Sequence, residues 1–220
     1  MRFAIFEDNK IEASPGATGT CYGCKSQLVA KCGTQNIWHW AHKGRGRCDS
    51  WWEPETRWHR SWKDRFPKSW QEFFFRGDDE EMHFADVRTP SGLVIEFQHS
   101  YIEEWERRAR EQFYGNLIWV VDGTRLKRDR LTFLSGMSAN RGLCGDPEQF
   151  VFNGFGRQIT KRWADSECFV CLDFDDDDLW CVSPYKSNWQ FFATCVSKDE
   201  FTDVFCNGQV PGAFSRLPRR

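Results

Sequence analysis

The most regular alternation of hydrophobic and polar positions lies in the middle of the chain. Pro54 suits the first turn of a helix, and the pattern extends that helix to about Phe66. Side chains four residues apart share a helix face. Two rows are therefore expected side by side, an aromatic row and a polar row, formed by Trp58, Trp62 and Phe66 and by Glu55, His59 and Lys63.

Three strands, a helix and a fourth strand are expected next. Gln71–Arg76 is typical of a buried strand, and residues 83–88 and 93–99 predict two strands joined by a Thr-Pro-Ser-Gly turn. Ser100 and Glu103 predict a capping box for a helix that ends at Gly115. Its expected buried stripe is Ile102, Trp105, Ala109 and Phe113. Leu117–Asp122 is a continuous apolar run, which indicates a strand covered on both faces.

This order of elements favours an α+β (α/β) fold in which helices cover a mixed central sheet. The flanking regions differ from the middle. Residues 1–49 are rich in Gly, Cys and His and contain short strand-like pieces, whereas residues 123–220 begin basic and then turn to short apolar strands. In the last region, residues 167–174 and 179–182 predict a hairpin around an Asp-rich turn. Ser197 and Glu200 predict the cap of a short helix through Phe205.

Two carboxylates on the predicted hairpin carry the strongest chemical signal. Val94, Glu96 and Gln98 share one strand face. A five-residue turn over 89–93 would set Asp86 opposite Glu96, with Cβ atoms about 5 Å apart; a bulge at Gly92 would do the same by another route. Facing carboxylates repel each other unless a cation joins them, and hard oxygen ligands suit Mg²⁺ or Mn²⁺.

The alternative is an edge hairpin whose solvated face happens to carry Asp, Glu and Gln. Strongly apolar stretches flank both strands, which indicates a central position in the sheet. A helix bearing Glu55 precedes the strands and another helix follows them. These features favour a cation site over a solvated face.

A second cluster of candidate ligands lies in residues 1–49. Cys21 and Cys24 have the two-residue spacing of a zinc knuckle and are followed by His39, His42 and Cys48. We expect Cys21, Cys24, His42 and Cys48 to hold a structural zinc ion, with His39 as the substitute for either of the last two. Cys32 is the weakest candidate because it lies in a strand-like segment. The alternative is a reduced Cys pair with packed His residues.

The cysteines near the C-terminus favour a different interpretation. Cys168 and Cys171 have the same spacing as the knuckle, but they lie in a strand pattern. We therefore expect apolar cysteines in a small β extension rather than a second zinc site.

Composition bounds the partners. The net charge is −2 and the pI about 6.2, so nucleic-acid binding would have to rest on local clusters. One basic cluster comprises Lys43, Arg45, Arg47, Arg57, Arg60, Lys63, Arg65 and Lys68, and another comprises Arg107, Arg108 and Arg110. The chain has 12 Trp. Trp38, Trp40, Trp51 and Trp52 could stack on bases or pack in a core.

The sequence shows neither the apolar core of a signal peptide nor an apolar run long enough to span a membrane. We therefore expect a cytoplasmic protein with no membrane partner, in which the 10 Cys stay reduced.

Several motifs in order resemble the competence-protein CoiA-like family of the PD-(D/E)xK nuclease superfamily. The resemblance rests on Ala85-Asp86-Val87, on Ile95-Glu96-Phe97-Gln98-His99-Ser100 and on Ile118-Trp119-Val120-Val121. Upstream it rests on Cys21-x-x-Cys24, His39-Trp40-Ala41-His42 and Glu55-x-x-x-His59-x-x-x-Lys63. It spans about residues 13–122 of the printed sequence and leaves the remainder unexplained.

The resemblance implies a restriction-endonuclease-like αβββαβ core over 50–122, a zinc-binding N-terminal module over 1–49 and a C-terminal β extension over 123–220. It also implies hydrolysis of phosphodiester bonds, of DNA, in prokaryotic transformation, recombination or defence. Asp86, Glu96 and the Phe97 carbonyl would hold Mg²⁺ or Mn²⁺. Glu55 would reach in from the first helix, directly or through a water.

The resemblance leaves one departure to explain. Gln98 stands where the superfamily usually has Lys, and a neutral amide can orient a nucleophile but cannot offset charge. Lys63 is the candidate source of the missing positive charge. Gln98 also keeps open a nucleic-acid-binding protein on a nuclease fold that does not cleave. A purely structural zinc module is the third hypothesis.

Overall fold

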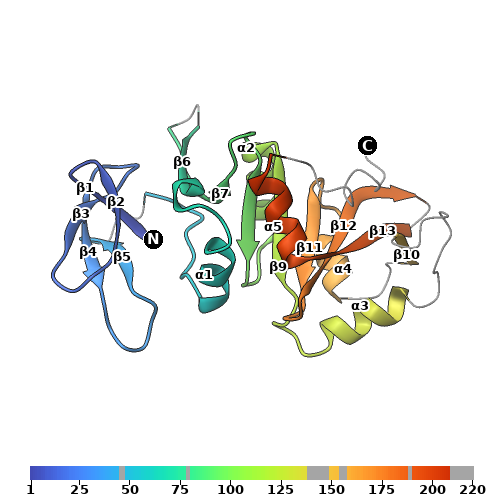
Figure 1. Cartoon of the computed structure of the whole chain (residues 1–220). Coiled ribbons are helices and arrows are strands. Elements are labelled where there is room, and N and C mark those ends of the chain that lie inside the picture. Colours follow the sequence, from blue (N-terminus) through green and yellow to red (C-terminus); the bar gives the residue numbers. More distant parts are fainter. Residues whose placement is uncertain (45–47, 78–79, 138–148, 154–157, 188–189, 209–220) are drawn as a thin grey trace. The chain divides into compact units, whose positions relative to one another are not determined.

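The computed structural model describes residues 1–44, 48–77, 80–137, 149–153, 158–187 and 190–208. The chain divides into a first unit, Met1–Arg88, and a second unit, Thr89–Arg220. Figure 1 labels their helices and strands. Each unit is described by itself.

The first unit begins with a five-stranded antiparallel sheet of order β2-β1-β3-β4-β5 (Figure 1). Its strands are β1 Phe3–Phe6, β2 Asn9–Glu12, β3 Thr18–Thr20, β4 Gln27–Lys31 and β5 His39–His42. A small core forms under one face, from Ala4, Ala13, Cys21, Leu28 and Trp40. Such a core is thin, and sheets of this size usually need a further source of stability.

Helix α1, Arg57–Lys63, is shorter than the sequence pattern suggests. The Thr56 hydroxyl accepts a hydrogen bond from the His59 backbone N–H, and the His59 ring accepts one from the Thr56 N–H. This reciprocal cap starts the helix after Thr56. The expectation that Glu55 lies on the helix is therefore wrong, because Glu55 precedes the cap.

A short 3₁₀ turn, Lys68–Trp70, leads into the antiparallel pair β6 (Gln71–Arg76) and β7 (Met82–Arg88). Gln71 pairs with Val87 and Phe73 with Ala85, so Glu72 lies across from Asp86. Glu72 has φ +46°, in the left-handed region that L residues avoid. Among the described residues it is the one non-glycine residue within a strand that has a positive φ.

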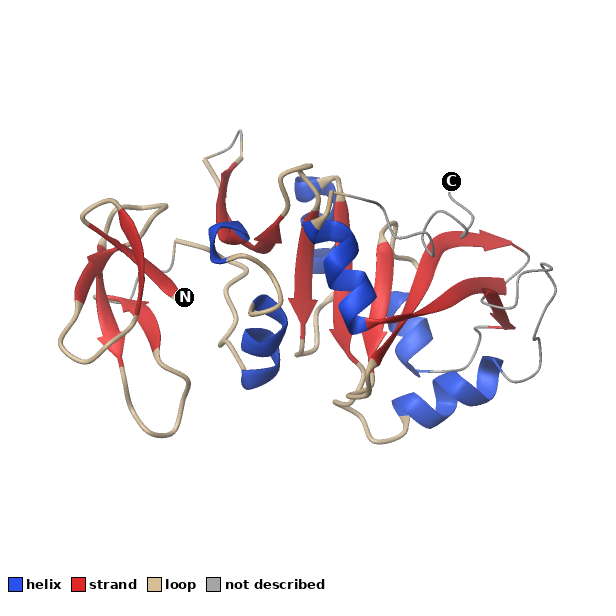
Figure 2. Cartoon of the chain, viewed as in Figure 1, coloured by secondary structure: helices blue, strands red, loops and turns tan. Residues whose placement is uncertain are grey.

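The second unit contains a mixed sheet, whose strands appear in red in Figure 2. Strands β8 (Val94–Gln98), β9 (Leu117–Asp122) and β11 (Phe169–Asp173) run parallel. Strands β12 (Asp178–Ser187), β13 (Gln190–Ser197) and β10 (Gln149–Asn153) continue the sheet with antiparallel pairing.

Helices cover both faces of this sheet (Figure 1). Helices α2 (Glu104–Tyr114) and α4 (Gln158–Trp163) lie on the face of Trp119, where Glu111 accepts from the Trp119 indole and Trp163 packs on its ring. Helix α3 spans Asp129–Met137. Helix α5 (Lys198–Cys206) covers the other face, and its Ser197 cap accepts from the Glu200 N–H as predicted.

The predicted order of helix, three strands, helix and strand is confirmed by α1, β6, β7, β8, α2 and β9. Strands β6 and β9 have the predicted bounds, and every residue of β9 is buried, as expected for a strand covered on both faces. The predicted hairpin around the Asp-rich turn corresponds to β11 and β12, which continues to Ser187. Strands β10 and β13 and helices α3 and α4 were not predicted.

Helix α2 differs most from its prediction. It begins at Glu104, one residue after Glu103, so the predicted capping box with Ser100 does not form. The predicted apolar stripe is also wrong, because Trp105 is 68% exposed and the buried positions are Arg107, Arg110 and Glu111. The physical reason is ion pairing, since each buried arginine contacts two carboxylates.

Candidate functional site: a Cys₃His cluster and a buried lysine among carboxylates

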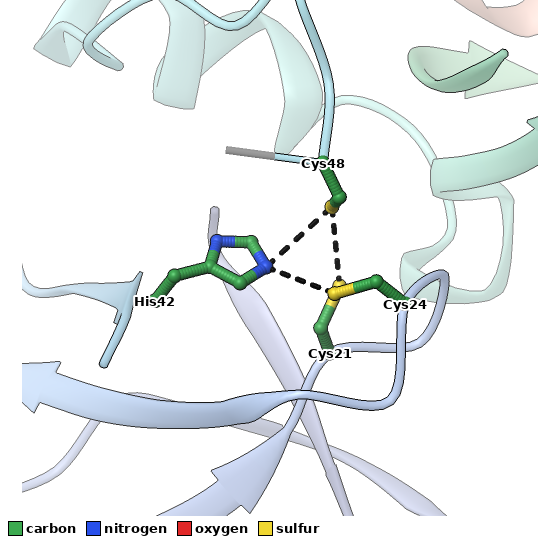
Figure 3. Close-up of side chains that lie close together, drawn as sticks. All are labelled: Cys21, Cys24, His42 and Cys48. Carbon is green, nitrogen blue, oxygen red and sulfur yellow. Dashed lines mark hydrogen bonds between the residues drawn. The ribbon is translucent and has the colours of Figure 1, made fainter. Parts of the chain in front are cut away.

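The first unit brings together Cys21, Cys24, His42 and Cys48, whose ligand atoms all lie within 4.8 Å of one another. Cys21 and Cys24 flank a tight turn between β3 and β4, and His42 ends β5. Figure 3 shows the His42 ring directed at the sulfur atoms. These are the four side chains that the spacing singled out.

The distances in this cluster suit a tetrahedral zinc ion. The Sγ atoms of Cys21 and Cys48 are 3.6 Å apart, and His42 Nε2 lies 3.3 Å from Cys24 Sγ and 3.5 Å from Cys48 Sγ. A tetrahedron with ordinary Zn–S and Zn–N bonds has S···S edges of about 3.8 Å and S···N edges of about 3.6 Å. The cluster can therefore hold zinc after small adjustments.

The protonation of the cluster prepares it for a cation. A hydrogen bond from Cys48 lowers the pKa of the Cys21 thiol to about 5. The same hydrogen bond raises the pKa of the Cys48 thiol above its usual range, and burial raises it further. A thiolate is thus already favoured at Cys21, and a bound metal would replace the proton on Cys48.

The other candidate ligands lie outside this cluster. The Nδ1 atom of His39 lies 2.8 Å from the Ile37 carbonyl oxygen. Cys32 packs at the edge of the small core. The structure therefore does not use His39 as the substitute for His42 or Cys48.

The Cys₃His cluster is built against the β6–β7 pair. A Cβ on Gly23, in the knuckle, would lie 2.6 Å from the Phe74 ring, so only glycine allows this approach. Asp49, next to Cys48, contacts the His83 ring and accepts from the Phe84 N–H at 2.9 and 3.0 Å. The His83 ring also stacks on Trp51, with centroids 3.3 Å apart. The knuckle and the strand that carries Asp86 thus share one packed region.

Three carboxylates surround a buried ammonium group in the same unit. Lys63 Nζ lies 3.1 Å from an oxygen of Asp86 and 3.3 Å from oxygens of Glu55 and Glu72. The Lys63 side chain is 6% exposed. Arg60 adds a second cation beside Glu55. The buried N-terminal ammonium of Met1 is a third, since it interacts electrostatically with Glu72 and Glu55.

The cluster shifts the pKa values of its members. Burial alone would raise the pKa of Glu55, but the charges of Lys63 and Arg60 bring it down to about 2. Burial alone would lower the pKa of Lys63, but Asp86, Glu72 and Glu55 raise it above its usual range. Both groups are therefore ionised at neutral pH.

Glu72 is the member of this cluster that the sequence analysis missed. It was expected only as part of a buried strand, and its place follows from the pairing of β6 with β7. The spacing of Glu55, His59 and Lys63 indicated that Glu55 and Lys63 would lie close together, and they form an ion pair. No comparable pattern marks Glu72.

The remaining predicted catalytic residues lie in the second unit. Glu96 is buried in β8 and forms an ion pair with Arg110 at 3.2 Å. The Gln98 side-chain amide donates to the Ser100 carbonyl and hydroxyl oxygens, both at 3.2 Å. Phe97 lies between them in the strand and is also buried. The turn expected after β7 closes through a bond from the Thr89 N–H to the Leu93 carbonyl.

The basic clusters are less exposed than expected for a nucleic-acid surface. Lys63, Arg107 and Arg110 are buried in ion pairs, which removes them from any solvent-facing patch. Lys43, Arg57, Arg65 and Lys68 are exposed, whereas Arg45 and Arg47 lie outside the described residues. Of the tryptophans, Trp40 is a core residue and Trp38 is 46% exposed.

Within the described residues, no helix is long and apolar enough to cross a membrane.

Strands β1 to β5 thus form a small antiparallel sheet that, together with Cys48, carries a Cys₃His cluster, a zinc-finger-like module. Residues 9–50 match the family described as "Competence protein CoiA, N-terminal domain". The matched segment contains all four members of the cluster and ends before Glu55. No curated protein and no solved structure matches the chain.

Proposed function

We propose that the chain is a metal-dependent nuclease that hydrolyses phosphodiester bonds, of DNA, as a cytoplasmic competence-related protein. The observation that carries the proposal is the Lys63 ammonium enclosed by Glu55, Glu72 and Asp86. Asp86 offers a hard oxygen ligand for a divalent cation, and the ammonium beside it can offset the charge of a phosphate bound to that cation.

Lys63 answers the difficulty raised by Gln98. The resemblance called for a positive charge where Gln98 stands, and Lys63 lies 3.1 Å from Asp86, the first predicted ligand. The ammonium–oxygen distances are hydrogen-bond distances, about 1 Å longer than an Mg–O bond. The proposal therefore keeps Lys63 in place as the group that offsets charge on the phosphate. The cation is assigned to the ligands that the sequence predicts.

The roles of the other residues follow. The proposed ligands of Mg²⁺ or Mn²⁺ are Asp86, Glu96 and the Phe97 carbonyl. Glu55 supports these ligands, directly or through a water, and the Gln98 amide orients the nucleophile. The cation supplies Lewis-acid charge and lowers the pKa of a bound water. The Cys₃His cluster holds a structural zinc that stabilises the thin N-terminal core.

The test is cleavage of single- and double-stranded DNA, and of RNA, with Mg²⁺, Mn²⁺ or EDTA. Asp86→Asn and Glu96→Gln should each reduce cleavage by about 10²-fold or more, because each removes charge that stabilises the transition state. Asp64→Asn is the matched control, since the Asp64 side chain is exposed and forms an ion pair with Arg2. Metal-independent cleavage, or full activity of both carboxylate variants, would overturn the proposal.

A second candidate is a nucleic-acid-binding protein that does not cleave. The observation that favours it is the Gln98 amide, which is bonded to Ser100 and contributes no charge. Salt-sensitive gel shifts with intact DNA in every metal would support this candidate over the nuclease.

A further inference from the structure

The Glu72 carboxylate bridges two parts of the first unit. One oxygen is 3.3 Å from Lys63 Nζ. The carboxylate also accepts hydrogen bonds from the backbone N–H groups of Arg2 and Phe3, at 2.5 and 3.0 Å. Phe3 begins β1, a central strand of the sheet that carries the Cys₃His cluster. Glu72 thus joins that sheet to the Lys63 ammonium.

The backbone at Glu72 supports a functional reading of this contact. Its φ of +46° lies within β6, where neighbouring residues keep their pairing with β7. A left-handed conformation at a non-glycine residue costs of the order of 1 kcal/mol and persists where the surroundings enforce it. The other non-glycine residues with positive φ among the described ones lie in turns or loops. We attribute the conformation of Glu72 to the contacts of its carboxylate with Lys63 and with the Arg2 and Phe3 amides.

We propose that Glu72 is a positioning residue for the cation site. It holds the Lys63 ammonium next to Asp86 and links this ammonium to the sheet that carries the Cys₃His cluster. The chain of contacts runs from the Arg2 and Phe3 amides through Glu72 and Lys63 to Asp86. This inference rests on the proposed function, since it assigns Asp86 to the cation. Outer partners of this kind typically change metal affinity by about 10- to 100-fold when they are removed.

The experiment measures Mn²⁺ binding by electron paramagnetic resonance, and DNA cleavage, on the same zinc-loaded chain of 220 residues. Glu72→Gln should raise the Mn²⁺ dissociation constant about 10- to 100-fold, because it keeps an amide oxygen for the backbone but loses the charge that holds Lys63. Glu12→Gln is the matched control, since Glu12 pairs with Arg2 and Lys68 and not with Lys63. Zinc content should stay equal in the two variants, and both should be folded at the temperature of the measurement.

A second variant covers the case in which Glu72→Gln does not fold. Glu72→Asp keeps the charge, and Asp tolerates positive φ better than most residues, so it should restore most of the Mn²⁺ affinity. Equal Mn²⁺ affinity in a folded Glu72→Gln and in Glu12→Gln overturns the role of Glu72 alone. If Glu72→Gln does not fold, a folded Glu72→Asp whose Mn²⁺ affinity falls about 10-fold or more overturns it.

The two proposals fail in different ways. Wild-type protein that binds Mn²⁺ without cleaving overturns the nuclease, and the comparison of binding still decides the role of Glu72. Wild-type protein that does not bind Mn²⁺ overturns both.

Discussion

The two units bury charge in different ways. In the second unit the Glu111 carboxylate accepts hydrogen bonds from one charged and three neutral donors: Arg107, the Trp119 indole, the Ser166 hydroxyl and the Glu167 N–H. In the first unit three carboxylates converge on the single ammonium of Lys63. Neutral donors stabilise a carboxylate without changing the charge balance. The Lys63 cluster instead gathers three carboxylates around one ammonium, and this convergence distinguishes the candidate site from the structural network.

Zinc removal should give the largest difference between the units. Structural zinc contributes about 10 kcal/mol or more in small modules, which exceeds the stability of a thin core. Cys24→Ser, or chelation, should therefore abolish protection of backbone amides in β3, β4 and β5 and leave β9 and β11 protected. Hydrogen exchange with mass spectrometry measures this.

Cys32→Ser is the matched control, because Cys32 is a half-buried cysteine in the same module that lies outside the cluster. Full protection of β3–β5 in zinc-free protein would contradict the assignment of a structural zinc.

Replacement of the buried cations should separate the two networks. Lys63→Met and Arg107→Met each leave carboxylates without their cation, and each should lower the free energy of unfolding by about 3–5 kcal/mol. Mn²⁺ at 100-fold its dissociation constant should stabilise wild type and Arg107→Met alike, by about 3 kcal/mol, and should stabilise Lys63→Met more, because there the cation also replaces the missing positive charge. Urea unfolding with and without Mn²⁺ measures both effects. Equal stabilisation of the two variants by Mn²⁺ would erase the proposed distinction.

Acid should weaken the Lys63 cluster through Glu55. The charges of Lys63 and Arg60 lower the pKa of Glu55 to about 2 in the folded chain, from an ordinary value of 4.5 when unfolded. Its contribution is therefore present above pH 4.5 and is lost as the pH falls toward 2. The loss is at most about 3 kcal/mol.

Urea unfolding between pH 6 and pH 3 should show a shallower decline for Glu55→Gln than for wild type. Glu7→Gln, in an exposed turn, is the control and should follow wild type. Parallel declines of Glu55→Gln and wild type would show that the Glu55 carboxylate has no special role in the acid response.

The smallest expected effect concerns Gln98. Lysine at this position can still donate to the Ser100 oxygens, and it adds the charge that the nuclease superfamily usually carries there. Gln98→Lys should therefore keep or raise the cleavage rate, by no more than about tenfold. Steady-state kinetics on DNA measure it, and complete loss of activity would assign a geometric role to the amide.

The sequence predicted the parts of the fold that depend on local pattern. Strands β6 to β9 have strong apolar patterns and clear turns, and their bounds agree with the prediction to within one residue. The four members of the Cys₃His cluster followed from ligand spacing. Short strands such as β10 have weaker patterns and were missed.

The failures come from interactions between distant residues. The α2 pattern marked Trp105 as buried, but ion pairs with Asp165 and Glu96 turn Arg107 and Arg110 inward. Glu72 gave no local signal because its importance depends on strand pairing and on the start of β1. Hydrophobic period cannot report such contacts, since it treats every charged residue as a surface residue.

The position of β1 has a practical consequence for any attempt to isolate the family-matched segment. Strand β1 lies between β2 and β3, and it precedes residue 9 in the chain. A polypeptide cut to residues 9–50 would lose the neighbour of both strands, and β2 would have no hydrogen-bonding edge to join. Excision for metal-binding or structural work should therefore begin before Phe3, or the isolated piece will aggregate through its open edges.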